Sequence, residues 1–335
     1  FALVGAGLGI GLAAGGLRLL EPRVRRPLVT ALVAVLLVSL MEPFLRVVFL
    51  QLGQGGIAGF FYESGGLAPA GALVVFVAVL AIGLAAAYRG HLVRERVDEL
   101  PEQQQRGLQI GAFVVGVIIL LLLPQIIGSF LSEVVGTVGL FILMGLGLNI
   151  VVGYAGLLDL GYVAFFAIGA YASAILTSPA SALGWELSFW VAIPIVMVVA
   201  ALAGLIIGAP VLRLRGDYLA IVTLGIGEIV RILLLSDALR PWTGGAQGIL
   251  QVPPPALLEI DFFRPQNLYY PILFFAVVGA FVAFSLANSR VGRAWNAMRE
   301  DEDVAAATGI NVTNYKLLAF SLGAVFGCIA GAFLA

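Results

Sequence analysis

The sequence predicts an all-α polytopic membrane protein, and three observations favour this class. Of the 335 residues, 61% are hydrophobic and only 11% are charged, and the mean hydropathy is +1.08. A soluble domain carries about 25% charged residues. The apolar residues also come in blocks of about 20, which as helices cross a bilayer roughly 30 Å thick. A β-barrel would instead show alternating segments of about ten residues.

About ten segments are predicted to span the membrane. The second is expected to kink or end at Glu42-Pro43, because a proline ring disrupts the preceding helical turn. The eighth is the least apolar, because it contains Glu228 and Arg231. The ten segments are 2–20, 27–50, 67–87, 108–131, 134–152, 158–176, 187–209, 218–235, 268–287 and 315–335.

Basic residues predict the orientation and the domain organisation. Fourteen of the 18 lysines and arginines fall in alternate loops, which indicates that these loops are cytoplasmic. The charged loop 88–107 is predicted to be a solvated linker. We therefore expect an N-terminal membrane region with this linker over 1–107, and a core over 108–335. The long outer segment 236–267 either receives an extracytoplasmic partner or caps the bundle.

Glycines spaced four residues apart predict close helix packing. Gly323, Gly327 and Gly331 lie on one helical face, and Gly204 and Gly208 repeat the spacing. The same spacing occurs at positions 7, 11 and 15. In lipid, small residues let helix backbones approach closely, so we expect a compact bundle or contact with a partner subunit. The single cysteine, Cys328, lies in an apolar run and is expected to be a packed core residue.

The stretch "GLNIVVGYAGLLDLG", residues 147–161, places polar side chains inside very apolar sequence. Its polar side chains belong to Asn149, Tyr154 and Asp159. An unpartnered polar group in hydrocarbon costs several kcal/mol, so these groups need a structural reason. We expect Gly153 and Gly156 to end one helix and Asp159 to cap the next. The result is either a tight turn near the inner face or a helix break beside a pore.

Glu228 and Arg231 are the second polar feature within a predicted span. They lie three residues apart, so they share a helix face and are able to pair. Charged groups at this depth normally face the bundle interior or a water-filled cavity. Two interpretations stay open: an internal ion pair that fixes the position of the helix, or part of the wall of a transport path.

The cytoplasmic loop 289–316 predicts a docking element. An acidic run ends at Asp303, and a short Ala-rich helix follows that we expect to end at Gly309. The helix presents small apolar residues together, including Val304, Ala305 and Ala306. A short apolar face rimmed by charge is typical of a helix that binds in a groove of another protein.

No pattern in the sequence predicts catalysis. His91 is the only histidine and Cys328 the only cysteine, so the usual transition-metal spacings are missing. The only lysine, Lys316, does not lie in a phosphate-binding glycine loop. We therefore expect no enzyme activity, no cofactor and no nucleic-acid partner for this chain. Without a phosphate-binding loop of its own, the protein as a pump would take its energy from a partner protein or from an ion gradient.

Three blocks together closely resemble one family. The blocks 147–176, 210–234 and 289–320 are similar to the permease subunits of bacterial branched-chain amino-acid ABC importers, the LivM type. The resemblance implies a multi-pass inner-membrane subunit in an importer of branched-chain or other neutral amino acids. Its partners would be a LivH-type second permease, two cytoplasmic ATPases that use ATP and Mg²⁺, and an extracytoplasmic amino-acid-binding protein.

The resemblance also implies roles for particular residues. The segment Asp301–Asn311 would be the helix that couples to the ATPase. Its core contacts would be Ala305, Ala306, Gly309 and Ile310, beside Val304. Asn149, Tyr154 and Asp159 would belong to the translocation path, together with Glu228 and Arg231. The family continues beyond the last residue here with further membrane segments, so the core is expected to be truncated at its C-terminus.

Two other functions compete with this one. An ion-coupled secondary amino-acid transporter would use Glu228, Arg231 and Asp159 for ion coupling. That class predicts paired discontinuous helices in two repeats, whereas the sequence indicates one clear break. A purely structural membrane subunit would not need the docking loop.

Overall fold

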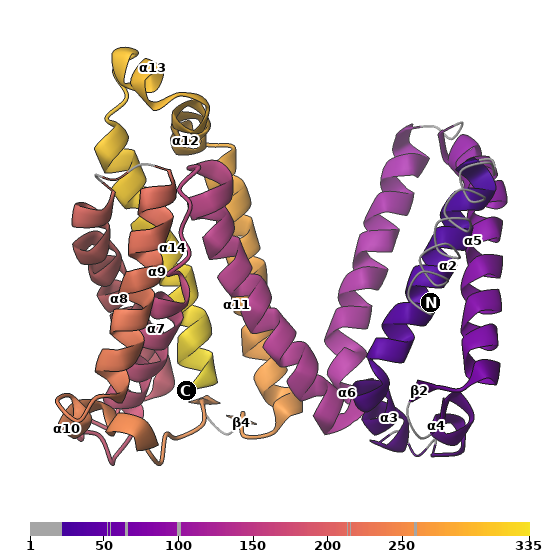
Figure 1. Ribbon diagram of the computed structural model, residues 1–335, viewed down its shortest axis with the longest axis horizontal. Coiled ribbons are helices and arrows are strands. Elements are labelled where there is room, and N and C mark those ends of the chain that lie inside the picture. The colour runs from indigo at the N-terminus through magenta and orange to yellow at the C-terminus, as the bar shows by residue number, and fades with distance from the viewer. Residues whose placement is uncertain are drawn as a thin grey trace, which may run out of the picture. The chain divides into compact units, whose positions relative to one another are not determined.

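The computed structural model describes residues 22–335, apart from 52, 54, 64–65, 99–101, 213, 215 and 258–259. The chain forms two compact units, residues 1–122 and 123–335, and the boundary between them along the sequence falls within helix α6 (Glu102–Leu148) (Figure 1). The predicted segment 2–20, with the spaced glycines at 7, 11 and 15, lies outside the described residues. The division of the chain at residue 107 stays a prediction.

The first unit is a bundle of helices joined by a small hairpin. Its elements are α2 (Pro22–Leu40), α3 (Glu42–Gln51), α4 (Gly55–Phe61), β1 (Tyr62–Glu63), β2 (Gly66–Leu67) and α5 (Pro69–Asp98). The helices α2 and α3 bend by 73° at Met41, which confirms the kink predicted at Glu42-Pro43. The strands β1 and β2 are antiparallel, with Tyr62 opposite Leu67. The Tyr62 hydroxyl donates to the Val38 carbonyl at 3.2 Å.

The charged segment 88–107, predicted to be a solvated linker, contains parts of two helices. Helix α5 continues to Asp98 and α6 begins at Glu102, so most of the segment is helical. The reason is local: this stretch is rich in Leu, Arg, Glu and Gln, which are strong helix formers.

Helix α6 also places one break differently from the prediction. The predicted spans 108–131 and 134–152 lie in one apolar run, Gln109–Tyr154, of 46 residues. A straight helix of that length would be about 69 Å long, more than twice the bilayer core. The run is interrupted at Gly128, where φ is 77° and ψ is −179°, and not at 131–134. Pro124, one turn earlier, has no backbone amide to donate, and the Ser132 hydroxyl donates to the Gly128 carbonyl at 2.6 Å.

The second unit contains the remaining long helices. They are α7 (Val163–Thr177), α8 (Phe189–Val211), α9 (Asp217–Leu235), α11 (Pro265–Ala287) and α14 (Val312–Leu334). Among the described residues, six helices are long and apolar enough to cross a membrane, and the bent α2–α3 pair would be a seventh. The chain is therefore a polytopic helical membrane protein, while the count of about ten spans stays a prediction. Helix α7 has only 15 residues.

Helix α14 packs between α7 and α8 at the centre of the second unit (Figure 1). A Cβ atom on Gly331 would overlap the Phe166 carbonyl of α7, so only glycine permits this approach. A Cβ atom on Gly204 of α8 would lie 2.8 Å from the Ser321 Cα of α14. The Ser321 hydroxyl donates to the Ala201 carbonyl at 2.9 Å. These contacts confirm the predicted small-residue packing, and Cys328 is fully buried, as expected.

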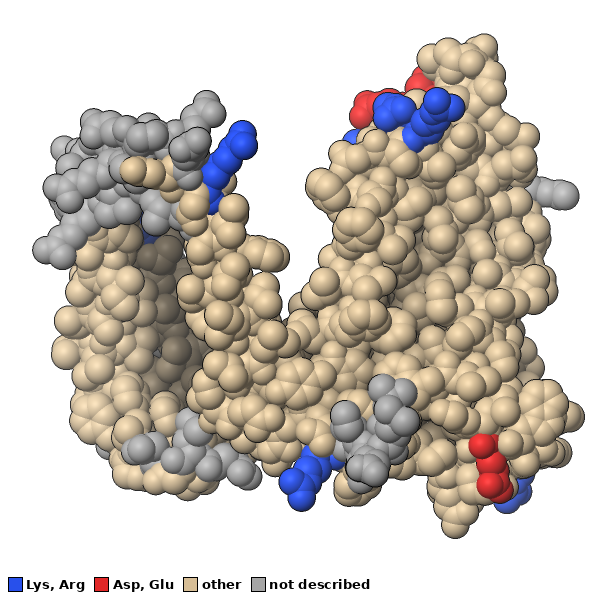
Figure 2. Space-filling view, turned by 180° about the vertical axis from the view of Figure 1, so that it is seen from behind, with Lys and Arg blue, Asp and Glu red and all other residues tan. Residues whose placement is uncertain are grey.

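On the face shown in Figure 2, the charged side chains of the second unit lie at its ends. Figure 2 shows acidic and basic side chains gathered at its two ends, with an almost uncharged surface between them. One end carries α12 (Arg290–Glu300) and α13 (Glu302–Ala307) (Figure 1). An uncharged belt between charged ends is the surface that a helix bundle presents to a bilayer.

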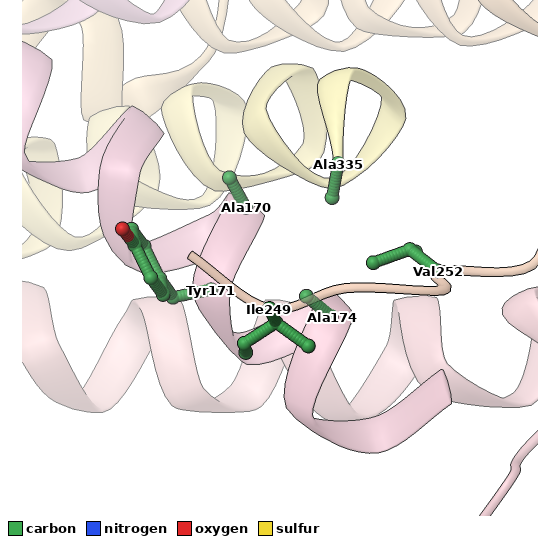
Figure 3. Close-up of a pocket in the computed structure, with 6 residues that line it drawn as sticks. All are labelled: Ala170, Tyr171, Ala174, Ile249, Val252 and Ala335. Atoms are coloured by element: carbon green, nitrogen blue, oxygen red, sulfur yellow. The ribbon is translucent and has the colours of Figure 1, made fainter. Parts of the chain in front are cut away.

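The predicted outer segment 236–267 lies at the opposite end and is largely ordered by short elements. It contains α10 (Arg240–Thr243), a 3₁₀ turn (Gly245–Gln247) and the antiparallel strands β3 (Ala256–Leu257) and β4 (Ile260–Asp261). The Trp190 indole donates to the Ala256 carbonyl at 3.0 Å, and the Ser178 hydroxyl to the Leu250 carbonyl at 2.6 Å. Part of this segment and α7 line an apolar pocket of 140 Å³ (Figure 3).

Candidate functional site

The predicted helix break lies between α6 and α7 and is built around a π-helix. Helix α6 passes into a π-helical turn, η1 (Asn149–Tyr154), in which the Ala155 amide donates to the Ile150 carbonyl at 3.2 Å. Gly156 follows with a φ of 72°, a conformation that favours glycine. The chain then stays non-helical until Val163. The predicted helix end at Gly153 and Gly156 is confirmed, and π-helical turns are frequent at functional sites.

Asp159 does not cap α7, in contrast to the prediction. The residue before α7 is Tyr162, so Asp159 lies too far upstream to reach the first free amides of the helix. Its Oδ1 instead accepts from the Gly161 amide at 2.9 Å and closes a turn. Asp159 is 5% exposed, and its Oδ2 has no hydrogen-bond partner among the described residues. The local sequence correctly predicted that this carboxylate lies at the helix break, but not that its partner is the Gly161 amide.

The non-helical segment is fastened to helix α9. The Leu160 amide donates to the Thr223 hydroxyl at 3.1 Å. A Cβ on Gly161 would overlap the Thr223 carbonyl, and a Cβ on Gly227 would lie 3.2 Å from the Gly161 Cα. The break and α9 therefore touch backbone to backbone, and a displacement of one would be transmitted to the other.

Tyr162 ties the same segment to the central helix. Its buried hydroxyl donates to the Gly323 carbonyl of α14 at 2.7 Å. Tyr162→Phe is expected to lower the free energy of unfolding by about 1 kcal/mol, because a buried hydrogen bond to α14 is lost. Thermal unfolding of the purified variant in detergent measures this effect. An unchanged midpoint would show that another group satisfies the carbonyl.

Glu228 and Arg231 pair on α9 in the arrangement that their spacing predicts. The Arg231 Nε and Nη2 atoms donate to the two Glu228 carboxylate oxygens at 2.9 and 2.6 Å. The side chains are 53% and 62% exposed, so the pair is not internal to the described chain. Both residues border a cavity of 260 Å³ whose opposite wall is formed by the start of α7.

Only some of the residues predicted to form the translocation path line this cavity. Leu160 and Gly161 of the break line it with Glu228 and Arg231, whereas Asn149, Tyr154 and Asp159 do not. Asn149 is exposed, and its amide lies over Gly153, where a Cβ would overlap the Asn149 Oδ1 atom. Tyr154 is half-buried.

The predicted docking helix is α13, and both of its ends are capped. The Asp301 carboxylate accepts from the Asp303 and Val304 amides at 2.9 and 3.0 Å. At the other end the Ile310 amide donates to the Ala305 carbonyl at 3.2 Å, and Gly309 has a φ of 93°. This is a Schellman motif, and it confirms the predicted helix end at Gly309. Asn311 in turn caps α14 by accepting from the Asn314 amide at 3.1 Å.

The exposed face of α13 is narrower than the predicted contact set. Val304 is 60% exposed, and Ala306, Ala307 and Gly309 are also exposed. Ala305 is only 3% exposed and Ile310 is half-buried, because both pack towards the rest of the chain. We define the docking face as Val304, Ala306 and Ala307.

Two further contacts hold α12, α13 and α14 together. Trp295 of α12 is fully buried, and its indole donates to the Tyr315 carbonyl at 2.9 Å. The ammonium group of Lys316 lies 2.5 Å from the Glu302 carboxylate, and Lys316 is only 4% exposed. Sequence reasoning missed both residues. The spacing of Trp295 and Met298 on one face of a charged helix was the available signal for a buried face.

Fold and site together define a multi-pass α-helical membrane protein of the transport class, with a helix break beside a polar helix face and a capped helix at one end. The chain belongs to the family described as branched-chain amino acid transport system / permease component, whose model matches residues 130–335. The match covers the break, α9 and the docking face. This family consists of transport permeases, and the chain is a multi-pass protein of the bacterial inner membrane.

Individual relatives agree with the family. The chain is 41% identical over 174 residues to the high-affinity branched-chain amino acid transport system permease protein LivM of Salmonella typhimurium and of Escherichia coli. Each match covers 45% of this chain and 40% of the relative. A probable branched-chain amino acid transport permease protein LivM of Methanocaldococcus jannaschii is 30% identical over 139 residues, which is 40% of this chain and 39% of the relative. The matches thus span about 40% of these relatives' length, and no solved structure matches the chain.

Proposed function

We propose that this protein is the membrane-spanning subunit of an ATP-driven importer of branched-chain or other neutral amino acids. It would form half of the translocation path and couple to a cytoplasmic ATPase. The docking face carries the proposal: three small exposed apolar residues on a short helix that is capped at both ends. Such a helix is preorganised to bind a partner, because little conformational freedom remains to be lost.

The proposal includes the partners that an importer of this kind requires. They are a second permease of the LivH type, two cytoplasmic ATPases and an extracytoplasmic amino-acid-binding protein. ATP and Mg²⁺ would be bound by the ATPases, and this chain would carry no cofactor. The ordered outer segment 236–267, at the end opposite α13, is the surface on which the binding protein would dock.

The exposed ion pair supports a place for α9 in the path wall. Glu228 lies about 17 Å along α9 from its first residue, near the middle of a bilayer core. An ion pair facing lipid at that depth is costly, so charged groups there face a protein or a water-filled cavity. Because the described chain does not cover the pair, we propose that it faces the path at the contact with the second permease.

The role of the ion pair can be tested by neutralising it. Glu228→Gln is expected to lower uptake by about tenfold, because an unpaired Arg231 then remains at membrane depth. The double variant Glu228→Gln/Arg231→Gln should restore complex assembly but not uptake, since the polar wall is still lost. Uptake into proteoliposomes and the yield of assembled complex are the measurements.

A matched control lies in the first unit. Glu42 and Arg46 form a comparable pair within one helix, at 3.7 Å. Glu42→Gln should therefore leave uptake unchanged. If the double variant at 228 and 231 recovered full uptake, the pair would only hold the helix in position and would not belong to the path.

Two experiments test the proposal as a whole: co-purification of the partner subunits, and identification of the energy source for uptake. The tagged full-length protein should bring down two ATPase subunits and a second permease from native membranes in mild detergent. The reconstituted complex should take up a neutral amino acid with ATP and without any ion gradient. Uptake that follows an imposed ion gradient and ignores ATP would establish the secondary transporter instead.

A further inference from the structure

The end of α12 touches the helix break directly. The Arg299 Nη1 atom donates to the Gly153 carbonyl at 2.6 Å, across 146 residues of sequence. The stem of Arg299 also lies on Gly156, where a Cβ atom would come within 2.6 Å of the Arg299 Cγ. Gly153 and Gly156 are the two glycines at which the membrane helix ends.

The bond has a clear electrostatic basis. Gly153 lies in the last turn of η1, and carbonyls at a helix C-terminus lack donors within the helix. The same end carries the negative pole of the helix dipole, so a cation is favoured there. A guanidinium group gives a charge-assisted bond, which is stronger than a neutral one. The neighbouring Glu300 carboxylate also lies near Arg299, with its Oε1 3.7 Å from Nη2.

Arg299 is also connected to the docking face. Only Asp301 separates α12 from α13, and its carboxylate caps α13. The Trp295–Tyr315 bond and the Lys316–Glu302 pair hold the two helices to the start of α14. A displacement of α13 would therefore carry Arg299 with it as part of one body.

On its far side the break is joined to α9. The segment after Gly156 reaches Leu160 and Gly161, which bond to and pack against Thr223 and Gly227. One turn further along α9 lies the Glu228–Arg231 pair. Direct contacts thus run from the docking face through Arg299 and the break to the cavity beside α9.

We propose that Arg299 is a positioning residue that transmits movement of the docking face to the helix break, and so couples ATPase closure to the path. This inference rests on the proposed importer function. It assigns no contact with the substrate to Arg299. It predicts that loss of the Arg299–Gly153 bond lowers amino-acid uptake while ATP hydrolysis continues.

The experiment compares Arg299→Ala, Arg299→Lys and Arg293→Ala in the complete reconstituted complex. Arg293 lies on the same helix, but its Nη1 donates to the nearby Asn288 carbonyl at 3.4 Å and not to the break. Arg299→Ala should assemble and hydrolyse ATP at the wild-type rate, while uptake falls about tenfold. Arg299→Lys should recover part of the uptake, and Arg293→Ala should match the wild type.

Amide hydrogen exchange supplies a readout that does not depend on transport. In Arg299→Ala, amides of residues 153–161 should exchange faster, with no change in α11 or α14. If Arg299→Ala kept the wild-type uptake per ATP hydrolysed, the inference would be overturned. A joint loss of assembly, ATPase activity and uptake would also overturn it, because Arg299 would then have a purely structural role. Failure of the proposed function is distinct, because the wild-type complex itself would then show no ATP-driven uptake.

Discussion

Replacing Val304 by arginine is expected to abolish ATP-driven uptake while the membrane region stays folded. Val304 is 60% exposed, and only its backbone amide takes part in the Asp301 cap, so the new side chain would not disturb α13. In a docked complex, however, the guanidinium group would be buried without a partner. An uncompensated buried charge costs about 3–5 kcal/mol, which would weaken binding to the ATPase by about 100-fold or more.

Co-purification of the ATPase subunits and uptake by the reconstituted complex are the measurements for Val304→Arg. Thr313→Arg is the matched control, because it places the same charge on an exposed position outside the docking face. Gly309→Arg would be harder to interpret, since a φ of 93° strains any residue with a side chain. Normal recovery of the ATPases with Val304→Arg would show that α13 does not dock.

Gly331→Val is expected to prevent correct folding of the second unit. A Cβ at this position would overlap the Phe166 carbonyl and lie 3.0 Å from the Ala170 amide nitrogen, both of which are backbone atoms of α7. Backbone cannot rotate away as a side chain can, so α7 and α14 would have to separate. Overpacking alone costs about 1–3 kcal/mol. Separation would also break the Tyr162–Gly323 and Cys328–Phe165 hydrogen bonds.

The measurement for Gly331→Val is the monodisperse fraction of protein recovered from detergent-solubilised membranes, followed by thermal unfolding. Gly225→Val provides the control, because Gly225 lies on the exposed face of α9 and a Cβ there would meet nothing within 4 Å. The control should be recovered at the wild-type level. Equal recovery of the two variants would contradict the close packing of α14 on α7.

Local chemistry in the sequence determined the class of protein and the ends of several elements. Apolar blocks of bilayer length determined the membrane helices, and Glu42-Pro43 marked the bend between α2 and α3. Gly309 ended the docking helix, and the spaced glycines of α14 predicted its close packing. Each of these features follows from the conformational range or the size of single residues, which does not depend on the rest of the chain.

Only the tertiary structure decided which distant groups meet. The partner of Arg299 lies 146 residues away, and the Leu160 amide bonds to a hydroxyl on α9. The inward turn of Ala305 and the outward position of the Glu228–Arg231 pair were likewise settled by packing. In a membrane protein the interior and the lipid are both apolar, so the hydrophobic pattern does not reveal which face of a helix is buried. Close packing between helices and hydrogen bonds across the bundle make that choice.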